Sequence, residues 1–286
     1  MLRRIGVGLS IALAALLLLT QVVIPHSRRP KLRADAEARL ARLEKGREIV
    51  LQACKAAGGL ETWQNKKDVS FRLTDEWHAP HCFWPEKKVE TMQHYLLHRN
   101  AGRIEARTGK GLQQWGLFEN KPWALLNGKV DSDGLKNADY VISNFDYFFA
   151  LPFKFLDTGA YPEFVGEETQ DGKIYDKVYV SFGLNVGKYP TDWYLAYFDH
   201  ATGRLTSVIY TSIEKSPSFV EYRASFDDYE EMDGLFMPTT VSIKMSRPLS
   251  GIKIRDWRIQ EVRFDTGLTE AFLKMPDISP PAISQR

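Results

Sequence analysis

The hydrophobic pattern changes its period along the chain, and each change predicts a new kind of element. Residues 34–57 carry apolar side chains at spacings of three, four and seven, which is the period of an amphipathic helix. Gly58 and Gly59 follow directly and are expected to end this helix, because glycine readily adopts the conformation found just past a helix end. From Val69 onward apolar and polar residues alternate, which predicts a half-buried strand.

Further strands with this alternation follow in two groups. Turn signals such as Asn127-Gly128, Thr202-Gly203 and Asp233-Gly234 lie between or after them. Short links of this kind favour antiparallel pairing, because parallel strands need long crossovers. The expected strands cover residues 69–74, 89–98, 102–108, 111–118, 122–126, 175–182, 192–199, 204–212, 219–229, 235–245 and 254–264.

One helical segment rich in phenylalanine separates the two groups of strands. Within residues 135–151 the apolar side chains fall on a single helical stripe. Pro152 is expected to break this helix, because proline removes a backbone donor. The stripe consists of Ala138, Val141, Ile142, Phe145, Phe148 and Phe149.

The first apolar run, residues 5–24, is long enough to span a membrane. It holds no charged residue and would rise about 30 Å as a helix, roughly the hydrocarbon thickness of a bilayer. A cleaved signal peptide is the alternative, but the stretch from Pro25 to Arg33 offers no small-residue cleavage site. We therefore expect residues 1–33 to form an uncleaved signal anchor with a basic linker, and residues 34–286 to form one domain.

Composition indicates a folded domain that does not bind nucleic acid. Hydrophobic residues make up 44% of the chain and aromatic residues 12%, which is enough for a substantial core. The 38 lysines and arginines nearly balance the 36 aspartates and glutamates. A nucleic-acid partner is not expected, because it would require a clustered basic face.

Four segments occur in an order and spacing shared with one known family. They are AAGGLETW at residues 56–63, YFFALPFKFLDTG at 147–159, DWYLAYFDHATGRLTSVIYT at 192–211 and FDDYEEMDGLFMPTTV at 226–241. Over residues 50–276 the chain thereby resembles the LolA/LolB-like lipoprotein carriers and their relatives. The resemblance implies an α+β fold in which a mostly antiparallel sheet forms an incomplete β-barrel, or half-barrel, wrapped around helices.

The same resemblance implies a place and a ligand. The family usually works outside the cytoplasm, and the apolar concave face of its sheet accepts acyl chains. We therefore expect a single-pass protein of the bacterial inner membrane with its main domain in the periplasm. The charges that flank the anchor, Arg3 and Arg4 before it and four basic residues at 28–33 after it, slightly favour the opposite orientation. The permanent anchor departs from the soluble carriers, so free shuttling of cargo is not expected.

Two cysteines leave two alternatives open. Cys54 falls in the last turn of the first long helix, and Cys82 falls in a loop after the first strand. In an oxidising compartment they would be able to form a disulfide that joins helix and sheet. Two unpaired buried thiols fit the spacing equally well.

A histidine-rich loop raises the question of a metal. His78, His81 and Cys82 are residue types that bind zinc or copper. Ordinary polar loop residues account for them as well, so we expect neither a metal nor a cofactor. The sequence contains no HExxH, GxSxG or CxxC motif, which argues against an enzyme.

Aromatic residues provide the candidate ligand-binding site. An ordinary core explains most aromatic stripes of this kind. In a half-barrel, however, a central helix either fills the concavity or borders a channel for a ligand. The candidate ligand-binding residues are Phe148, Phe149, Phe153, Phe155, Trp115 and Trp123.

Three functions follow from these features. The first is a membrane-anchored module of the cell envelope that binds an apolar ligand, namely an acyl chain, a lipid or a lipoprotein. The alternative is a non-catalytic scaffold that docks another membrane protein or complex. The third is a metal-dependent enzyme that uses His78, His81 and Cys82.

Overall fold

The computed structural model describes residues 36–78, 84, 86–183, 193–212 and 214–276. By its internal contacts the chain divides into two compact units. Unit 1 contains the residues up to 53 with residues 155–225 and 243–253, and unit 2 contains residues 54–154 and 226–242 with those from 254 onward. No helix within the described ranges has the length and hydropathy needed to cross a bilayer. The expected anchor, residues 5–24, lies outside the described residues.

The thirteen strands of the described residues follow the hydrogen-bonded order β6-β5-β4-β3-β2-β1-β13-β12-β11-β10-β9-β8-β7. Strands joined by short links pair antiparallel, as predicted, from β1 to β5 and from β7 to β11. β1 also pairs antiparallel with β13, which lies far from it along the chain. The order has two ends, so the sheet is open and not a closed barrel. The strands are β1 (Asp68–Trp77), β2 (Lys88–Leu96), β3 (Ala101–Thr108), β4 (Gly111–Phe118), β5 (Lys121–Leu126), β6 (Lys129–Val130), β7 (Ala160–Gln170), β8 (Lys173–Phe182), β9 (Trp193–Asp199), β10 (Leu205–Thr211), β11 (Glu221–Met232), β12 (Leu235–Arg247) and β13 (Lys253–Phe264).

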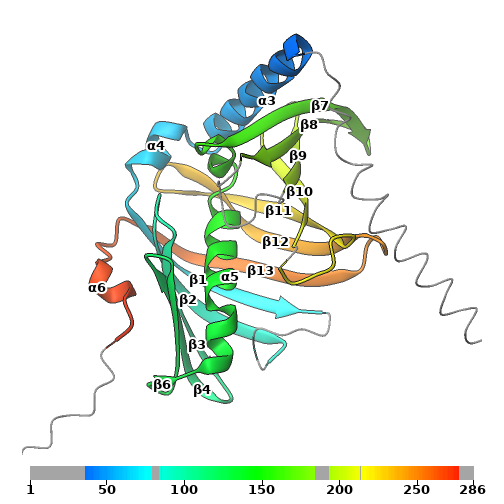
Figure 1. Ribbon diagram of the computed structural model, residues 1–286. Coiled ribbons are helices and arrows are strands. Elements are labelled where there is room, and N and C mark those ends of the chain that lie inside the picture. The colour runs from blue at the N-terminus through cyan, green and yellow to red at the C-terminus, as the bar shows by residue number, and fades with distance from the viewer. Residues whose placement is uncertain (1–35, 79–83, 85, 184–192, 213, 277–286) are drawn as a thin grey trace, which may run out of the picture. The chain divides into compact units, whose positions relative to one another are not determined.

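A few helices complete the mostly antiparallel architecture, which confirms the expected fold class to that extent (Figure 1). β7 was not expected, because Pro162 and Gly166 interrupt its pattern. Proline is tolerated on an edge strand, and β7 stands at one end of the strand order. The helices are α3 (Ala36–Ala56), α4 (Leu60–Asn65), α5 (Ser132–Phe149), a 3₁₀ helix (Phe153–Leu156) and α6 (Glu270–Leu273).

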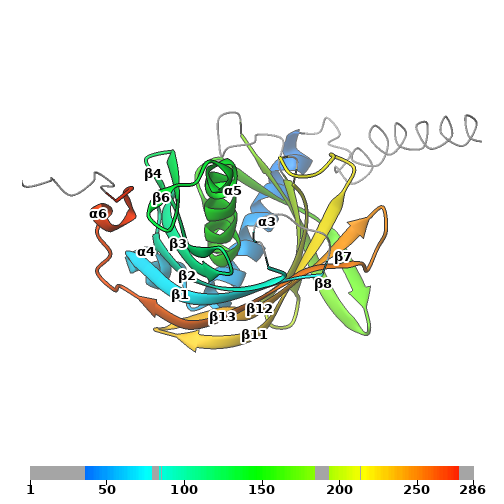
Figure 2. The same ribbon diagram turned by 90° about the horizontal axis from the view of Figure 1, so that it is seen from below.

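Unit 2 is built around α5. The side chain of Asp131 caps the helix by accepting hydrogen bonds of 3.1 Å from the backbone N–H groups of Asp133 and Gly134. The whole predicted stripe, Ala138 to Phe149, is buried, and the helix contacts β3, β4 and β5. Figure 2 looks nearly along α5 and shows the strands of this unit curving past it. The predicted helix, and the face that it buries, are confirmed.

Two glycines allow α5 to approach its sheet. A Cβ atom at Gly134 would lie 2.6 Å from the indole nitrogen of Trp115 on β4. On β3, a Cβ atom at Gly102 would lie 2.5 Å from the ring of Tyr95 and 3.0 Å from Ile142 of the helix. All three distances are shorter than van der Waals contact. A larger residue at either position would therefore push α5 away from the sheet, and at Gly102 it would also displace the ring of Tyr95.

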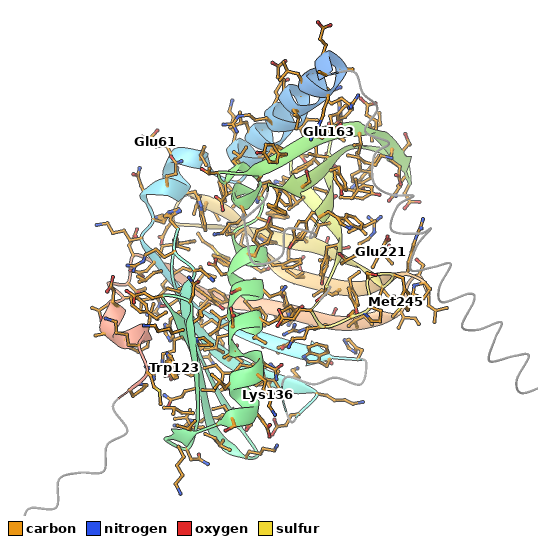
Figure 3. The ribbon with its side chains drawn as sticks, in the orientation of Figure 1. Glu61, Trp123, Lys136, Glu163, Glu221 and Met245 are labelled. Atoms are coloured by element: carbon orange, nitrogen blue, oxygen red, sulfur yellow. The ribbon has the colours of Figure 1, made fainter. Side chains whose placement is uncertain are left out.

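In unit 1 the helix α3 packs on β7. Arg42 donates a hydrogen bond of 2.6 Å to the buried carboxylate of Glu163, and the ammonium group of Lys45 lies 3.8 Å from the centre of the Phe164 ring. Figure 3 marks Glu163 where β7 passes α3. Gly46 is buried at this contact, and a Cβ atom there would lie 2.8 Å from the backbone nitrogen of Phe164. The glycine therefore sets how closely the helix meets the strand.

We predict that Gly46→Ala destabilises the protein although alanine is the better helix former. Alanine would gain about 1 kcal/mol of helix propensity. The clash with the β7 backbone should outweigh this gain, for a net loss of about 1–3 kcal/mol in the free energy of unfolding. Urea denaturation measures this loss. The control is Arg47→Ala at an exposed position of the same helix, whose free energy of unfolding should stay within about 0.5 kcal/mol of the parent's. A Gly46→Ala protein as stable as the parent would show that α3 does not pack this closely.

Candidate functional site

A small apolar cavity lies beneath the second half of α5 in unit 2. The helix contributes Phe145, Phe148 and Phe149 to its walls. The strands β1, β12 and β13 contribute Phe71, Leu73, Pro238, Val241, Trp257 and Ile259. Its volume is about 10 Å³, which is about the space of one water molecule.

The cavity walls are held by aromatic contacts between α5 and the sheet. The ring of Phe149 stacks on Phe71 of β1 with centroids 4.7 Å apart. Trp257 of β13 meets Phe145 at 4.8 Å and Phe148 edge-on at 5.7 Å. Such pairs contribute about 0.5–1.5 kcal/mol each beyond the burial of their surface. The aromatic face of α5 is thus fixed to two strands that are neighbours in the sheet.

A buried ion pair lies next to these walls. The guanidinium of Arg255 donates two hydrogen bonds of 2.5 Å to the carboxylate of Asp75, and both side chains are almost completely buried. The indole N–H groups of Trp84 and Trp77 donate to the same carboxylate, at 2.9 and 3.2 Å. The guanidinium also lies 4.9 Å from the centre of the Phe145 ring, which lines the cavity. A fully paired charge is therefore placed at the margin of the apolar space.

A second polar chain crosses the core of unit 2 on β2. The hydroxyl of Tyr95 donates to Gln93 at 2.6 Å, Gln93 donates to Thr91 at 3.0 Å, and Thr91 donates to the carbonyl of Leu73. Burial, and then the negative charge of Asp146, raise the pKa of Tyr95 well above its ordinary value. Tyr95 is consequently a neutral hydrogen-bond donor, which is the role that its contact with Gln93 requires.

The six expected ligand-binding residues are all buried, but only two of them line the cavity. Phe148 and Phe149 do so. Phe153 instead stacks on Trp63 at 4.8 Å, and Trp115 stacks on Trp84 at 4.4 Å. Trp123 of β5 donates its indole N–H to the carbonyl of Leu273 at 2.8 Å. Phe155 belongs to unit 1, where its ring lies 5.7 Å from Tyr194. A role in ligand binding stays a prediction, and the proposal below retains it for the two residues that line the cavity.

The strands supply cavity residues that sequence reasoning did not select. Phe71 with Leu73, and Trp257 with Ile259, are spaced two apart, so each pair points to one face of its strand. The alternation was visible in the sequence. The sequence did not show that β1 pairs with β13, because these two strands lie far apart along the chain.

The candidate metal ligands of the histidine-rich loop are only partly described. The ring nitrogen Nε2 of His78 lies 2.8 Å from a carboxylate oxygen of Asp256. His81 and Cys82 lie outside the described residues. The expectation that this loop binds no metal therefore stays untested, and both alternatives for the two cysteines stay open. Cys54 is buried, and burial raises the pKa of its thiol to about 12. Its thiolate is therefore scarce at neutral pH.

We predict that Arg255→Met lowers the free energy of unfolding by about 3–5 kcal/mol, because it leaves the Asp75 carboxylate buried without its counter-ion. The double variant Asp75→Leu with Arg255→Met should lose less than the sum of the two single variants, since no unpaired charge remains. The control is Arg99→Met, which breaks the half-exposed pair with Glu270 and should cost less than about 1 kcal/mol. Equal losses for Arg99→Met and Arg255→Met in urea denaturation would contradict this assignment.

Comparison with known proteins yields similar folds only. No protein-family model matches the chain, and no curated protein matches it either. A LolA superfamily protein from Nitrosomonas europaea is 12% identical, with 80% of this chain and 97% of that chain covered and a TM-score of 0.49. A DUF1329 family protein from Desulfovibrio piger is 11% identical, with 82% and 97% covered and a TM-score of 0.42. The lipoprotein LppX from Mycobacterium tuberculosis is 9% identical, with 78% and 98% covered and a TM-score of 0.30.

Proposed function

We propose that this protein is a membrane-anchored component of the bacterial cell envelope that binds an apolar ligand in unit 2. The ligand is an acyl chain, carried by a lipid or a lipoprotein, and it lies between α5 and the face of β1, β12 and β13. The half-barrel wrapped around its helices, which the sequence resemblance implies, is part of this proposal. No catalytic step is assigned to the site.

One observation carries the proposal, namely the apolar cavity at the aromatic end of α5. All nine residues that line it are apolar, and they come from one helix and three strands. Apolar walls with a few polar groups nearby are the usual composition of a small-molecule site. The paired charge of Asp75 and Arg255 provides such a polar group next to an otherwise hydrocarbon-like space.

The energetics allow the small cavity to widen around a ligand. A volume of about 10 Å³ is too small for an acyl chain, so side chains of α5 must move when one enters. Loss of the packing of one phenylalanine costs about 3–5 kcal/mol. Each buried methylene contributes about 0.8 kcal/mol, so ten of them contribute roughly 8 kcal/mol. An acyl chain can therefore offset the displacement of one aromatic side chain.

The small volume of the cavity also favours the second candidate function, a non-catalytic scaffold. If the core of unit 2 remains as closely packed as it is here, its outer surface alone would be available for a membrane partner. Lipid content separates the two functions, because a scaffold with a packed core retains no lipid in unit 2.

The anchor and the orientation belong to the proposal. The uncharged run at residues 5–24 supports a single-pass anchor in the inner membrane. The resemblance to envelope proteins supports a periplasmic position for the residues that follow.

We predict that Phe149→Ala changes the amount or the chain length of the lipid that co-purifies with the protein. Phe149 lines the cavity, so its truncation enlarges the space without removing the other walls. The full-length chain would be purified in a mild detergent, and bound lipid would be extracted and measured by mass spectrometry per folded chain. The parent should carry about one lipid per folded chain, because the proposal assigns a single acyl-chain site to unit 2.

Phe153→Ala is the matched control for this experiment. Phe153 is equally buried, follows the same helix and stacks on Trp63, but does not line the cavity. Its truncation should cost about 3–5 kcal/mol of stability in urea while leaving lipid content per folded chain unchanged. A parent protein without lipid, together with large stability losses in both variants, would contradict the binding function and leave the scaffold.

We predict that alkaline phosphatase fused after Arg286 is active and remains with the membrane after a carbonate wash. The enzyme folds only outside the cytoplasm, so its activity reports the orientation, and its retention reports an uncleaved anchor. Activity in the soluble fraction would show that the anchor is removed. An inactive, membrane-bound fusion would place the main domain in the cytoplasm, as the flanking charges slightly favour.

A further inference from the structure

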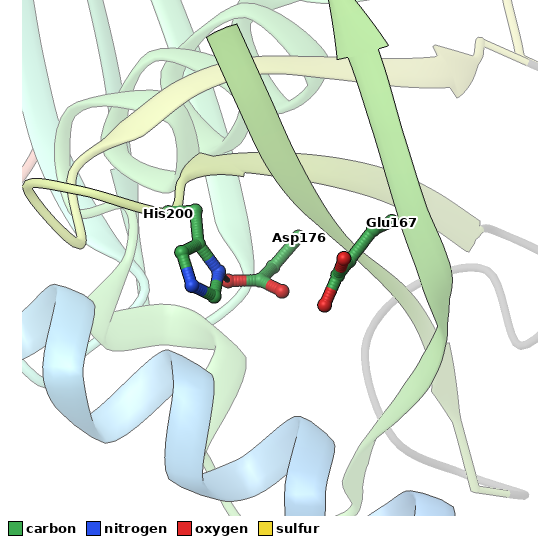
Figure 4. Close-up of side chains that lie close together, drawn as sticks. All are labelled: Glu167, Asp176 and His200. Atoms are coloured by element: carbon green, nitrogen blue, oxygen red, sulfur yellow. Dashed lines mark hydrogen bonds and ion pairs between the residues drawn. The ribbon is translucent and has the colours of Figure 1, made fainter.

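Three side chains able to ligate a metal converge in unit 1, apart from the apolar cavity. Glu167 comes from β7, Asp176 from β8, and His200 from the turn after β9. One ligand atom of each lies within 4.8 Å of those of the other two, and His200 Nδ1 lies 2.8 Å from Asp176 Oδ2. Figure 4 shows the imidazole of His200 beside the carboxylate of Asp176, with the carboxylate of Glu167 on the neighbouring strand. The group combines one nitrogen ligand with two oxygen ligands.

A β-bulge places Glu167 in this group. Phe164 pairs with Val178, but Gly166 already pairs with Lys177, so β7 contains one extra residue at this point. Gly166 takes a φ of 118°, a conformation that side chains other than glycine rarely adopt. The shift puts Glu167 directly opposite Asp176, on the same face of the sheet. Without the extra residue, Glu167 would face away from Asp176, because side chains alternate along a strand.

The electrostatics of the group favour a cation. Like charges directly opposite each other on paired strands are destabilising. Asp176 is also nine-tenths buried, which strengthens the repulsion by reducing the screening by water. Within the described part of the chain, no ion pair or hydrogen bond reaches the carboxylate of Glu167. A protonated His200 would compensate one of the two negative charges, whereas a divalent ion compensates both.

We propose that Glu167, Asp176 and His200 bind a divalent transition-metal ion, and that Zn²⁺ is the preferred ion. Imidazole suits zinc, whereas calcium and magnesium favour sites made of oxygen ligands only. Ligands on a tetrahedral Zn²⁺ at about 2.0–2.1 Å are roughly 3.3 Å apart. The exposed side chains of Glu167 and His200 can rotate to reach that spacing from the present 4.8 Å or less. Three protein ligands leave a fourth position for water.

This site is independent of the histidine-rich loop singled out in the sequence. His78 belongs to unit 2, and its ring is bonded to Asp256. The three ligands proposed here belong to unit 1 throughout. Bound metal would link β7, β8 and the turn after β9, and it would leave one coordination position open to solvent or to an anionic group.

The test is a titration of the full-length chain, stripped with a chelator in detergent, with Zn²⁺ by isothermal calorimetry. The parent should bind Zn²⁺ at this site. Loss of a residue that only hydrogen-bonds to a metal ligand weakens binding roughly 10–100-fold, so loss of a ligand in Glu167→Gln or His200→Gln should weaken it at least as much. Without metal, Glu167→Gln should unfold at or slightly above the parent's urea midpoint, because it removes the like charge opposite Asp176. His200→Gln should unfold slightly below it, because it loses the hydrogen bond to Asp176. The midpoint of each protein without metal is therefore its own reference. Zn²⁺ should raise that midpoint in the parent and not in the variants.

Glu168→Gln is the matched control. Glu168 adjoins Glu167 in sequence and carries the same charge, but it pairs with Lys177, at 3.1 Å. Its replacement should leave Zn²⁺ binding unchanged, and so should His78→Gln. A parent that binds no Zn²⁺, or variants that bind it as tightly as the parent, would overturn the site. Tighter binding of Ca²⁺ than of Zn²⁺ at these residues would overturn the choice of metal.

Discussion

The aromatic stripe of α5 can be buried only against the strands of unit 2, and this constraint determines the rest of that unit. Gly134 and Gly102 lack side chains where helix and strands come closest. Phe149 stacks on Phe71 and Phe148 meets Trp257 edge-on across the contact, and the cavity forms where this packing is incomplete. The candidate site is therefore a consequence of how one helix is packed, and any ligand that enters must compete with the packing of α5.

The buried ion pair of this core has most of its hydrogen-bonding capacity satisfied. Asp75 receives two hydrogen bonds from Arg255 and one from each of two indoles, so nearly every acceptor position of its carboxylate is occupied. Isolated, either charge would cost several kcal/mol in such surroundings. The carboxylates of Glu167 and Asp176 in unit 1 are arranged differently: they face each other across two paired strands, and the imidazole of His200 lies beside Asp176. The charge of Asp75 is compensated by Arg255, which makes that group a structural ion pair. The charges of Glu167 and Asp176 are not compensated in this way, which makes that group a candidate metal site.

Periodicity was sufficient to predict α5 and most strands, because amphipathic stripes and alternation reflect burial directly. Prediction from periodicity failed where the backbone departs from regular strand geometry. Pro162 and the bulge at Gly166 concealed β7, and His98, expected at the end of a strand, lies in a turn with a φ of 61°. The pairing of distant strands was also not visible in the sequence: Phe71 and Trp257 line the same cavity because β1 pairs with β13. Likewise, Glu167, Asp176 and His200 have no motif spacing, because a bulge and two strand pairings bring them together.

The most direct test of apolar ligand binding is site-resolved photo-crosslinking with a phospholipid that carries a diazirine in its acyl chain. After illumination of the full-length protein in vesicles, the labelled residues would be identified by mass spectrometry of peptides. The account predicts labels on the segment of α5 that contains Phe145 to Phe149 and on the facing residues near Trp257 and Val241. Labels confined to residues 5–24 and the outer surface, with none on these segments, would contradict it.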